Sequence, residues 1–240
     1  MKIKILTLFP DMFIEFKNES IIKRAIEKGV VEIEAIDIRQ YSLDKHHHVD
    51  DTPCGGGAGM VLQVDVLARA IRANTSDNSH IIMMTPQGEK YSQKKALELK
   101  KYDELVIICG HYEGFDERIR SFVDEEVSIG DYVLTGGELP AMVISDSIIR
   151  LLDNAIREES HEDDSFSTGL LEYPQYTRPI DFEGMVVPEV LLSGNHKEIA
   201  LFRKKESLRR TYLKRPDLLE NYKLSKEEEK LLEEIKKEMA

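Results

Sequence analysis

The sequence has few of the residues on which secreted and membrane proteins depend. It contains no Trp and only two cysteines, Cys54 and Cys109, which do not form a C-x-x-C pair. This excludes a disulfide framework and favours a reducing compartment. No apolar run approaches the roughly 18 residues that a membrane helix needs. The first ten residues alternate like a strand and carry charges, so we expect no signal peptide and a cytoplasmic protein.

The familiar glycine signatures for nucleotides are also absent. There is no G-x-x-x-x-G-K-[ST], and no G-x-G-x-x-G lies between a strand and a helix. This argues against a P-loop enzyme and against one rival interpretation, a nicotinamide or nucleotide enzyme on a doubly wound sheet. The formal net charge of −12 argues against a chain that is coated in nucleic acid, although an average can hide a local basic patch.

The most informative stretch is the segment 128–141, S-I-G-D-Y-V-L-T-G-G-E-L-P-A. Its glycines permit backbone turns that side chains would block. Between them, the apolar run 132–134 predicts a short buried strand. Glycine-flanked backbone can bind a flat, polar, neutral ring such as adenine through its own N–H and C=O groups. The segment therefore predicts a site for a nucleotide-like ligand.

Strands and helices alternate over the first two thirds of the chain. This alternation predicts an α/β domain with a mainly parallel sheet. The predicted strands are 2–9, 31–37, 80–85, 104–109 and 125–127, and the predicted helices are 11–28, 64–73, 92–100, 115–122 and 140–156. Residues 41–60 lack periodicity and are expected to form an extended functional loop. Ligands bind at the carboxyl ends of parallel strands, so we expect the loops 85–88, 110–114 and 128–140 to form the site.

The last third differs in composition. Residues 157–165 hold five acids, one arginine and no aliphatic residue, which predicts a mobile linker. We therefore divide the chain into an α/β domain (1–157), an acidic linker (158–172) and a small helical domain (173–240) with helices at 197–213 and 225–239. Residues 196–215 contain eight basic and two acidic residues. A basic helix on an acidic chain is typical of phosphate-backbone binding, although a solvated helix face is the plainer alternative.

Four motifs in the same order carry a family resemblance. C-G-H-Y-E-G-F-D-E-R at 109–118, the segment 128–141, D-S-F at 164–166 and Y-T-R-P at 176–179 together resemble the bacterial tRNA (guanine-N1)-methyltransferases. The resemblance implies a SPOUT-type parallel sheet with a deep trefoil knot, which strand–helix alternation alone does not predict. It also implies S-adenosylmethionine as methyl donor, and a homodimer with the active site at the subunit interface. The implied target is guanine 37, next to the anticodon, in a tRNA anticodon stem-loop. The rival from another class is a non-catalytic RNA-binding protein.

The resemblance assigns the catalytic roles to two residues. Asp164 is the implied general base for the N1 proton, acting across the subunit interface. Neighbouring Asp163 and Glu162 would raise its pKa by like-charge repulsion. Arg150 is the implied group that stabilises charge on O6. Without the resemblance, Asp164 is simply linker charge and Arg150 a surface arginine.

The resemblance also assigns the binding residues. Tyr112 is expected to pack on the ligand, with a core tyrosine as the alternative. The donor pocket is expected at Pro86, Gly110, Tyr112, Glu113, Gly114, Ser128, Ile129, Gly130, Asp131, Tyr132, Val133, Leu134, Gly136 and Pro140. The tRNA is expected at Gly55, Gly57, Arg178, His196, Lys197, Arg203, Arg209 and Arg210.

The sequence predicts no resident metal. In the run His46-His47-His48, adjacent side chains point in different directions, and no partner has the spacing of a zinc ligand. The family suggests that Mg²⁺ assists, but no ligand set is evident. Two positions depart from the family pattern: Cys54 stands where an aromatic residue often occurs, and His111 where arginine is common.

Overall fold

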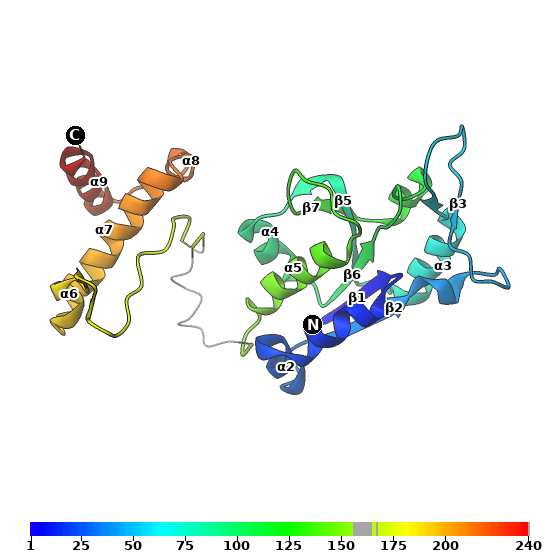
Figure 1. The fold of residues 1–240 in the computed structure, drawn as a ribbon, viewed down its shortest axis with the longest axis horizontal. Helices are drawn as coiled ribbons and strands as arrows, with labels where there is room; N and C mark the ends of the chain where they lie inside the picture. Colours follow the sequence, from blue (N-terminus) through cyan, green and yellow to red (C-terminus); the bar gives the residue numbers. More distant parts are fainter. Residues whose placement is uncertain (156–164, 167, 240) are drawn as a thin grey trace. The chain divides into compact units, whose positions relative to one another are not determined.

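A computed structural model of the chain describes residues 1–155, 165–166 and 168–239 (Figure 1). It contains two compact units, Met1–Glu158 and Glu159–Ala240. Residues 156–164, on which much of the expected linker falls, lie outside the described residues.

The first unit is built on a five-stranded sheet in the order β2-β1-β6-β5-β7. Every pair of neighbouring strands is parallel, which confirms the predicted parallel α/β sheet. The strands are β1 (Lys2–Thr7), β2 (Glu32–Asp37), β5 (Ser79–Lys90), β6 (Glu104–Cys109) and β7 (Glu125–Ser128). All five lie where the sequence predicts strands, except that β5 extends beyond its predicted end.

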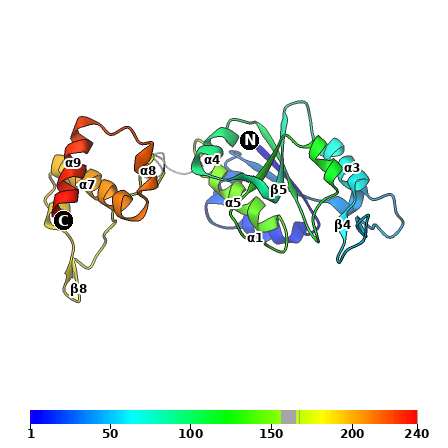
Figure 2. The ribbon, with the colours of Figure 1, turned by 90° about the horizontal axis from the view of Figure 1, so that it is seen from above.

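Helices cover both faces of this sheet (Figure 2). Successive residues of a strand point to opposite faces, so the central strand β6 contributes Leu105 and Ile107 to one core and Val106 and Ile108 to the other. The first core is covered by α1 (Phe13–Asn18), α2 (Ser20–Glu27), α4 (Gln93–Leu99) and α5 (Glu138–Ile149), and the second by α3 (Val64–Asn74) and the 3-10 helix η3 (Glu117–Phe122). The result is a three-layer α/β unit.

The single helix predicted at 11–28 is wrong. The segment forms a 3-10 turn, η1 (Pro10–Met12), followed by α1 and α2. Glu19 between the two helices is extended, with φ −120° and ψ 153°, and Ser20 has φ 53°. Asn18 and Ser20 favour non-helical backbone because their short polar side chains compete for backbone hydrogen bonds.

The strand predicted to end before Pro86 continues instead. Strand β5 pairs with β7 on both sides of a register shift between Met84 and Glu89. Residues 85–88 therefore form a bulge in a long strand, and not the predicted closing turn.

The loop predicted at 41–60 contains a small amount of regular structure. Two residues, β3 (Asp50–Asp51), pair antiparallel with β4 (Val61–Leu62), and the 3-10 turn η2 (Ile38–Tyr41) precedes the loop. The predicted α-helix at 115–122 is the 3-10 helix η3. It begins after Asp116, whose side chain accepts a hydrogen bond from the Arg118 amide.

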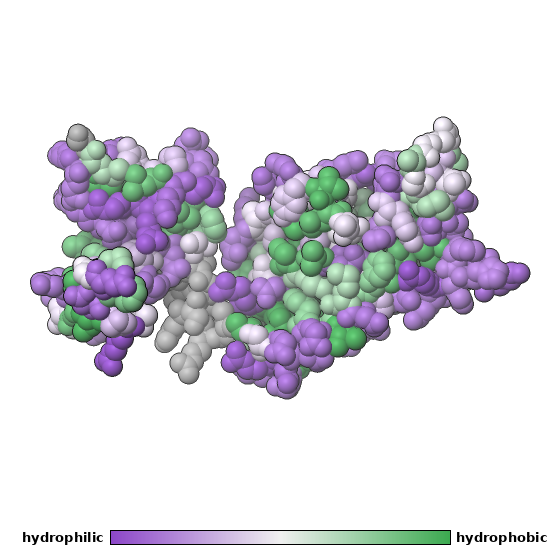
Figure 3. Space-filling model, in the orientation of Figure 1, coloured by the Kyte–Doolittle hydropathy of each residue, from purple (hydrophilic) through white to green (hydrophobic). Residues whose placement is uncertain are grey.

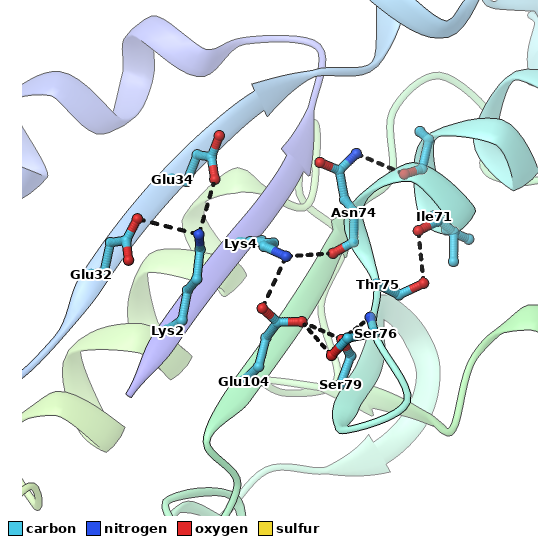
Figure 4. Close-up of polar contacts among 11 residues, drawn as sticks. Lys2, Lys4, Glu32, Glu34, Ile71, Asn74, Thr75, Ser76, Ser79 and Glu104 are labelled. Carbon is cyan, nitrogen blue, oxygen red and sulfur yellow. Dashed lines mark hydrogen bonds and ion pairs between the residues drawn. The ribbon is translucent and has the colours of Figure 1, made fainter.

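A polar network closes the amino end of the sheet (Figure 4). Lys4 Nζ lies 2.9 Å from Glu104 Oε2 and donates to the carbonyl oxygen of Asn74 at 2.8 Å. Ser79 Oγ also donates to Glu104. The network holds the starts of β1, β5 and β6 together, so the opposite, carboxyl end is left for a ligand.

The second unit is a small helical body. The predicted helices at 197–213 and 225–239 are confirmed as α7 (His196–Lys214) and α9 (Lys226–Glu238). Around them lie α6 (Glu189–Leu192), α8 (Asp217–Glu220) and the hairpin of β8 (Asp181–Phe182) and β9 (Met185–Val186). The core includes Leu208, Ile235 and Leu170, which the sequence assigns to the linker but which is buried here. Across the described residues, no helix has the length and apolar character needed to span a bilayer.

Candidate active site

Three loops at the carboxyl ends of β5, β6 and β7 meet in one cleft of about 340 Å³. Met84 and the bulge of β5 contribute residues 84–87, and the loop after β6 contributes 110–115. The loop after β7 contributes 129, 130 and 132–137, together with Pro140 of α5. These are the three loops that the sequence places at the carboxyl edge. The structure therefore brings together segments that are far apart in the chain.

Nearly all the residues expected at the donor pocket line this cleft. They are Pro86, Gly110, Tyr112, Glu113, Gly114, Ser128, Ile129, Gly130, Tyr132, Val133, Leu134, Gly136 and Pro140. Asp131 is the exception, because its side chain is 90% exposed and lies 3.5 Å from Lys90 Nζ. Asp131 points away from the cleft that its neighbours line.

One wall of the cleft consists of bare main chain. A Cβ atom on Gly137 would lie 2.7 Å from Cys109 Cα and 2.8 Å from the Gly110 nitrogen. A Cβ atom on Gly110 would lie 2.8 Å from the ring of Phe115. Only glycine fits at both positions, so the wall presents backbone groups at close range. A flat, polar ring fits such a wall without a charged side chain.

The buried strand predicted at 132–134 is wrong. Ser128 Oγ donates to the carbonyl oxygen of Gly130 at 3.0 Å and accepts from its amide at 3.2 Å, which closes a turn at the end of β7. Beyond this turn the chain leaves the sheet. Tyr132, Val133 and Leu134 are 54%, 84% and 37% exposed. Their apolar side chains are available to a ligand or to a second chain.

The loop after β6 is fastened to Met60 and Leu62, just beyond the glycine-rich segment 55–59. The Glu113 amide donates to the carbonyl oxygen of Met60 at 3.0 Å, and the Leu62 amide donates to that of Gly114 at 3.0 Å. Gly55 and Gly57, expected at the tRNA, have φ of +92° and +133°. The glycine-rich loop thus departs directly from the rim of the cleft.

Tyr112 is not a core side chain. It is 44% exposed and lines the cleft. Partial burial, and after it the nearby carboxylate of Asp50, raise the pKa of the Tyr112 hydroxyl. The hydroxyl therefore stays protonated near neutral pH and can donate a hydrogen bond.

The sequence reasoning missed Arg120 in η3. Its guanidinium lines the cleft, forms an ion pair with Glu126 of β7 and donates to Gln87 Oε1 of the β5 bulge at 2.7 Å. It thus ties η3 to strand β7 and to the bulge of β5. Arg120 lies two residues beyond the motif 109–118. Its closeness to that motif is the only feature of the sequence that could have pointed to it. Other lining residues outside the predicted donor set are Met84, Thr85, Gln87, His111, Phe115, Glu117, Val127, Thr135 and Gly137.

Of the two residues expected to be catalytic, the structure describes only Arg150. Asp164, with its acidic neighbours Asp163 and Glu162, lies outside the described residues. Arg150 follows the last turn of α5, where its amide donates to the carbonyl oxygen of Asp146 at 3.1 Å. The described residues that line the cleft do not include Arg150.

The basic residues expected at the tRNA differ in the second unit: some are exposed, and at least one is held in ion pairs. Arg178, His196, Lys197 and Arg203 are exposed. Arg209, in contrast, is held by Glu206 at 2.9 Å and by Glu238 of α9 at 2.5 Å. The acids of α9 thus neutralise part of the basic face of α7.

A pocket of about 480 Å³ lies beside this basic face, within the second unit. Its lining includes Tyr173, Tyr176, Arg178 and Arg203. The Arg203 guanidinium lies 4.8 Å from the centre of the Tyr173 ring.

Within the part of the chain that the structure describes, no three His, Cys, Asp or Glu side chains group as metal ligands. His48 Nδ1 lies 2.8 Å from Asp44 Oδ2, and this contact fixes the tip of the histidine-bearing loop.

Known proteins are similar to this chain over nearly its whole length. The family described as tRNA (Guanine-1)-methyltransferase TrmD matches residues 1–221. A tRNA (guanine-N(1)-)-methyltransferase of Geobacillus kaustophilus (strain HTA426) is 58% identical over 242 residues, covering 99% of both chains. Proteins of the same name from Bacillus cereus (strain AH820) and Bacillus anthracis (strain A0248) are each 56% identical over 241 residues, covering 98% of this chain and 99% of theirs. The chain is therefore an enzyme that belongs to the TrmD family of tRNA (guanine-N1)-methyltransferases.

Proposed function

We propose that this enzyme transfers a methyl group from S-adenosylmethionine to N1 of guanine 37, the nucleotide 3′ of the tRNA anticodon. It acts in the cytoplasm as a homodimer, and its first unit carries the deep trefoil knot of the SPOUT superfamily. The observation that carries the proposal is the cleft at the ends of β5, β6 and β7, together with the family membership.

The cleft suits the donor because its wall is main chain. Backbone groups of Gly110, Ile129 and Leu134 would bind the adenine, and Tyr112 would pack on the ligand. The donor supplies an already activated methyl group on a sulfonium, so the protein needs no metal to activate it. The family's Mg²⁺ would therefore act with the RNA, and chelation should leave donor binding unchanged.

The acceptor nitrogen needs two kinds of help from the protein. N1 of guanine carries a proton and is a poor nucleophile until that proton leaves. We assign this proton to the carboxylate of Asp164, a contribution of about 10²–10⁴ in rate for a general base. We assign the negative charge that develops on O6 to the guanidinium of Arg150, which stays charged at all working pH values.

A shared active site is supported by the position of Arg150. Among the described residues that line the cleft of its own chain, Arg150 is absent. A second subunit would bring its own Arg150 to this cleft. We propose that donor pocket and base come from different subunits, with Asp164 acting across the interface.

The subunit interface is assigned to α5. This helix buries one side in the first core, yet its exposed side is also apolar, with Leu139 50% and Val143 48% exposed. Met12 and Ile14 add to the apolar surface of the first unit, and Figure 3 shows apolar side chains gathered on the face that carries α5. An exposed apolar patch of this kind is typical of a protein–protein interface.

A methyl-transfer assay tests the proposal. The purified protein is incubated with an anticodon stem-loop and methyl-labelled S-adenosylmethionine, and mass spectrometry locates the methyl group. We expect 1-methylguanine at position 37, and a fall of about 10² or more in turnover for Asp164→Asn, with donor affinity nearly unchanged. The exposed Asp153 gives the matched control Asp153→Asn, which should turn over normally. Unmodified RNA, or equal losses of donor affinity and turnover in Asp164→Asn, contradicts the assignment.

A further inference from the structure

A buried carboxylate lies directly beneath the glycine wall of the cleft. Glu138, the first residue of α5, is only 3% exposed. Thr7 Oγ1 donates to its Oε1 at 2.8 Å, and the first turn of a helix favours a negative charge. Over the described residues, no Lys or Arg forms an ion pair with Glu138. Burying a carboxylate without a positive charge beside it is costly in free energy. The position of Glu138 therefore calls for a functional explanation.

The second oxygen of Glu138 is directed at the cleft wall. A Cβ atom on Gly136 would overlap Glu138 Oε2 and would lie 3.0 Å from His111 Nδ1 and 3.3 Å from the carbonyl oxygen of Gly110. Gly136, Gly110 and His111 all line the cleft. A carboxylate oxygen, an imidazole nitrogen and a carbonyl oxygen therefore converge behind a wall that has no side chain to shield them.

His111 Nδ1 at this wall is buried and has no hydrogen-bond partner among the described residues. One further observation indicates a negative potential here. Burial, and after it the charge of Glu138, raise the pKa of the Cys109 thiol at the end of β6. The field of the carboxylate thus reaches the strand end that forms the wall.

We propose that Glu138 is a specificity-determining residue, the fixed negative countercharge that makes the cleft prefer the cationic sulfonium of S-adenosylmethionine to the uncharged thioether S-adenosylhomocysteine. The inference rests on the proposed function, because it takes the donor to bind in this cleft. The two molecules differ by one methyl group and one positive charge. A charge opposite Glu138 in a partly buried site gains attraction that the neutral product lacks, so the product is released more easily.

Two substitutions distinguish the countercharge role of Glu138 from a purely structural role, in which its hydrogen bond with Thr7 holds α5 against β1. Glu138→Gln removes the charge but keeps an oxygen that accepts from Thr7. Thr7→Val removes that hydrogen bond and keeps the charge. Only the first should change the preference between the two ligands.

The test is calorimetry on the full-length protein with each ligand in turn, near pH 8, where imidazole is ordinarily neutral. We expect Glu138→Gln to weaken S-adenosylmethionine binding by about tenfold and to leave S-adenosylhomocysteine binding within about twofold. Thr7→Val and the control Asp153→Asn should keep the wild-type ratio of the two dissociation constants.

The outcomes distinguish failure of the inference from failure of the proposed function. Equal losses for both ligands in Glu138→Gln, or no change in either, overturn the countercharge role. No binding of S-adenosylmethionine to the wild-type protein overturns the proposed function itself. Circular dichroism checks folding. If the Gln variant does not fold, Glu138→Asp, which keeps the charge, must retain the preference, and its loss there overturns the proposal.

Discussion

The amide of Gly137 donates a hydrogen bond to the carbonyl oxygen of Gly110 at 2.8 Å. This bond joins the loop after β7 to the loop after β6, and neither residue has room for a side chain. The contact sets the width of the cleft wall. It also explains why two glycines so far apart in the chain act as one structural unit.

Gly137→Ala should damage both folding and donor binding. Its Cβ would collide with backbone, which cannot move aside as a flexible side chain can. We expect a loss of about 1–3 kcal/mol in the free energy of unfolding, measured with urea, and a loss of measurable donor affinity by calorimetry. Gly29→Ala is the control. A Cβ there meets open space at a φ of +69°, so stability should fall by about 1 kcal/mol with donor affinity unchanged.

Leu139→Glu with Val143→Glu should separate the subunits. Two carboxylates on the exposed apolar side of α5 would have to be buried in the proposed interface, at a high desolvation cost. Analytical ultracentrifugation should show a dimer for the wild-type protein and a monomer for the double variant. Leu213→Glu, at a residue of similar exposure on α7, should stay dimeric. If the double variant sediments like the wild-type protein, α5 does not form the interface.

Glu104 should contribute to stability in a pH-dependent way. Burial raises the pKa of its carboxyl, but hydrogen bonds from Ser79 and Lys4 outweigh this and leave the pKa lowered. A lowered folded-state pKa stabilises the protein above the ordinary carboxyl value and ceases to do so as the pH falls through the folded value.

Glu104→Gln should therefore lower the free energy of unfolding by about 1–3 kcal/mol at neutral pH. The difference from the wild-type protein should shrink on acidification below about pH 4.3. Urea unfolding over a series of pH values measures the loss at neutral pH and its decrease on acidification. Glu34→Gln, at a half-exposed carboxylate whose Oε2 lies 3.8 Å from Lys2 Nζ, is the control and should show little effect at any pH. A constant difference at all pH values would argue against the charge of Glu104 as the cause.

Arg209 and Arg210 should differ in their effect on tRNA binding although they are neighbours on α7. Arg209 is paired with Glu206 and Glu238, whereas no ion pair within the described residues reaches Arg210. Arg210→Ala should reduce the salt dependence of stem-loop binding by about one counterion, and Arg209→Ala by less. Filter binding over a range of salt concentrations gives both slopes. Unchanged slopes in both variants would mean that the basic helix is only a solvated face.

The sequence predicted the sheet well because its strands are buried on both faces and flanked by helices. The apolar run 105–109 has no other plausible place in an α/β unit, and all five of its residues are buried in the core. The loops after these strands followed from the general position of ligand sites in parallel sheets.

Other features depend on contacts that no local pattern encodes. The apolar run 132–134 resembles a strand, but the turn closed by Ser128 carries it away from the sheet. Arg120 reaches the cleft only because η3 places it opposite Gln87. Glu138 follows two glycines in sequence, and its burial against Thr7 depends on the packing of α5 on β1. Such relationships arise from tertiary packing, which overrides local propensity.

The location of the donor is the central claim, and hydrogen–deuterium exchange tests it most directly. Exchange of the full-length protein is measured with and without S-adenosylmethionine. The account predicts slower exchange in all three loops, at 84–88, 110–115 and 128–137, with little change at the amino end of the sheet around Lys4 and Glu104. Protection confined to other segments, or no protection at saturating donor, would contradict it.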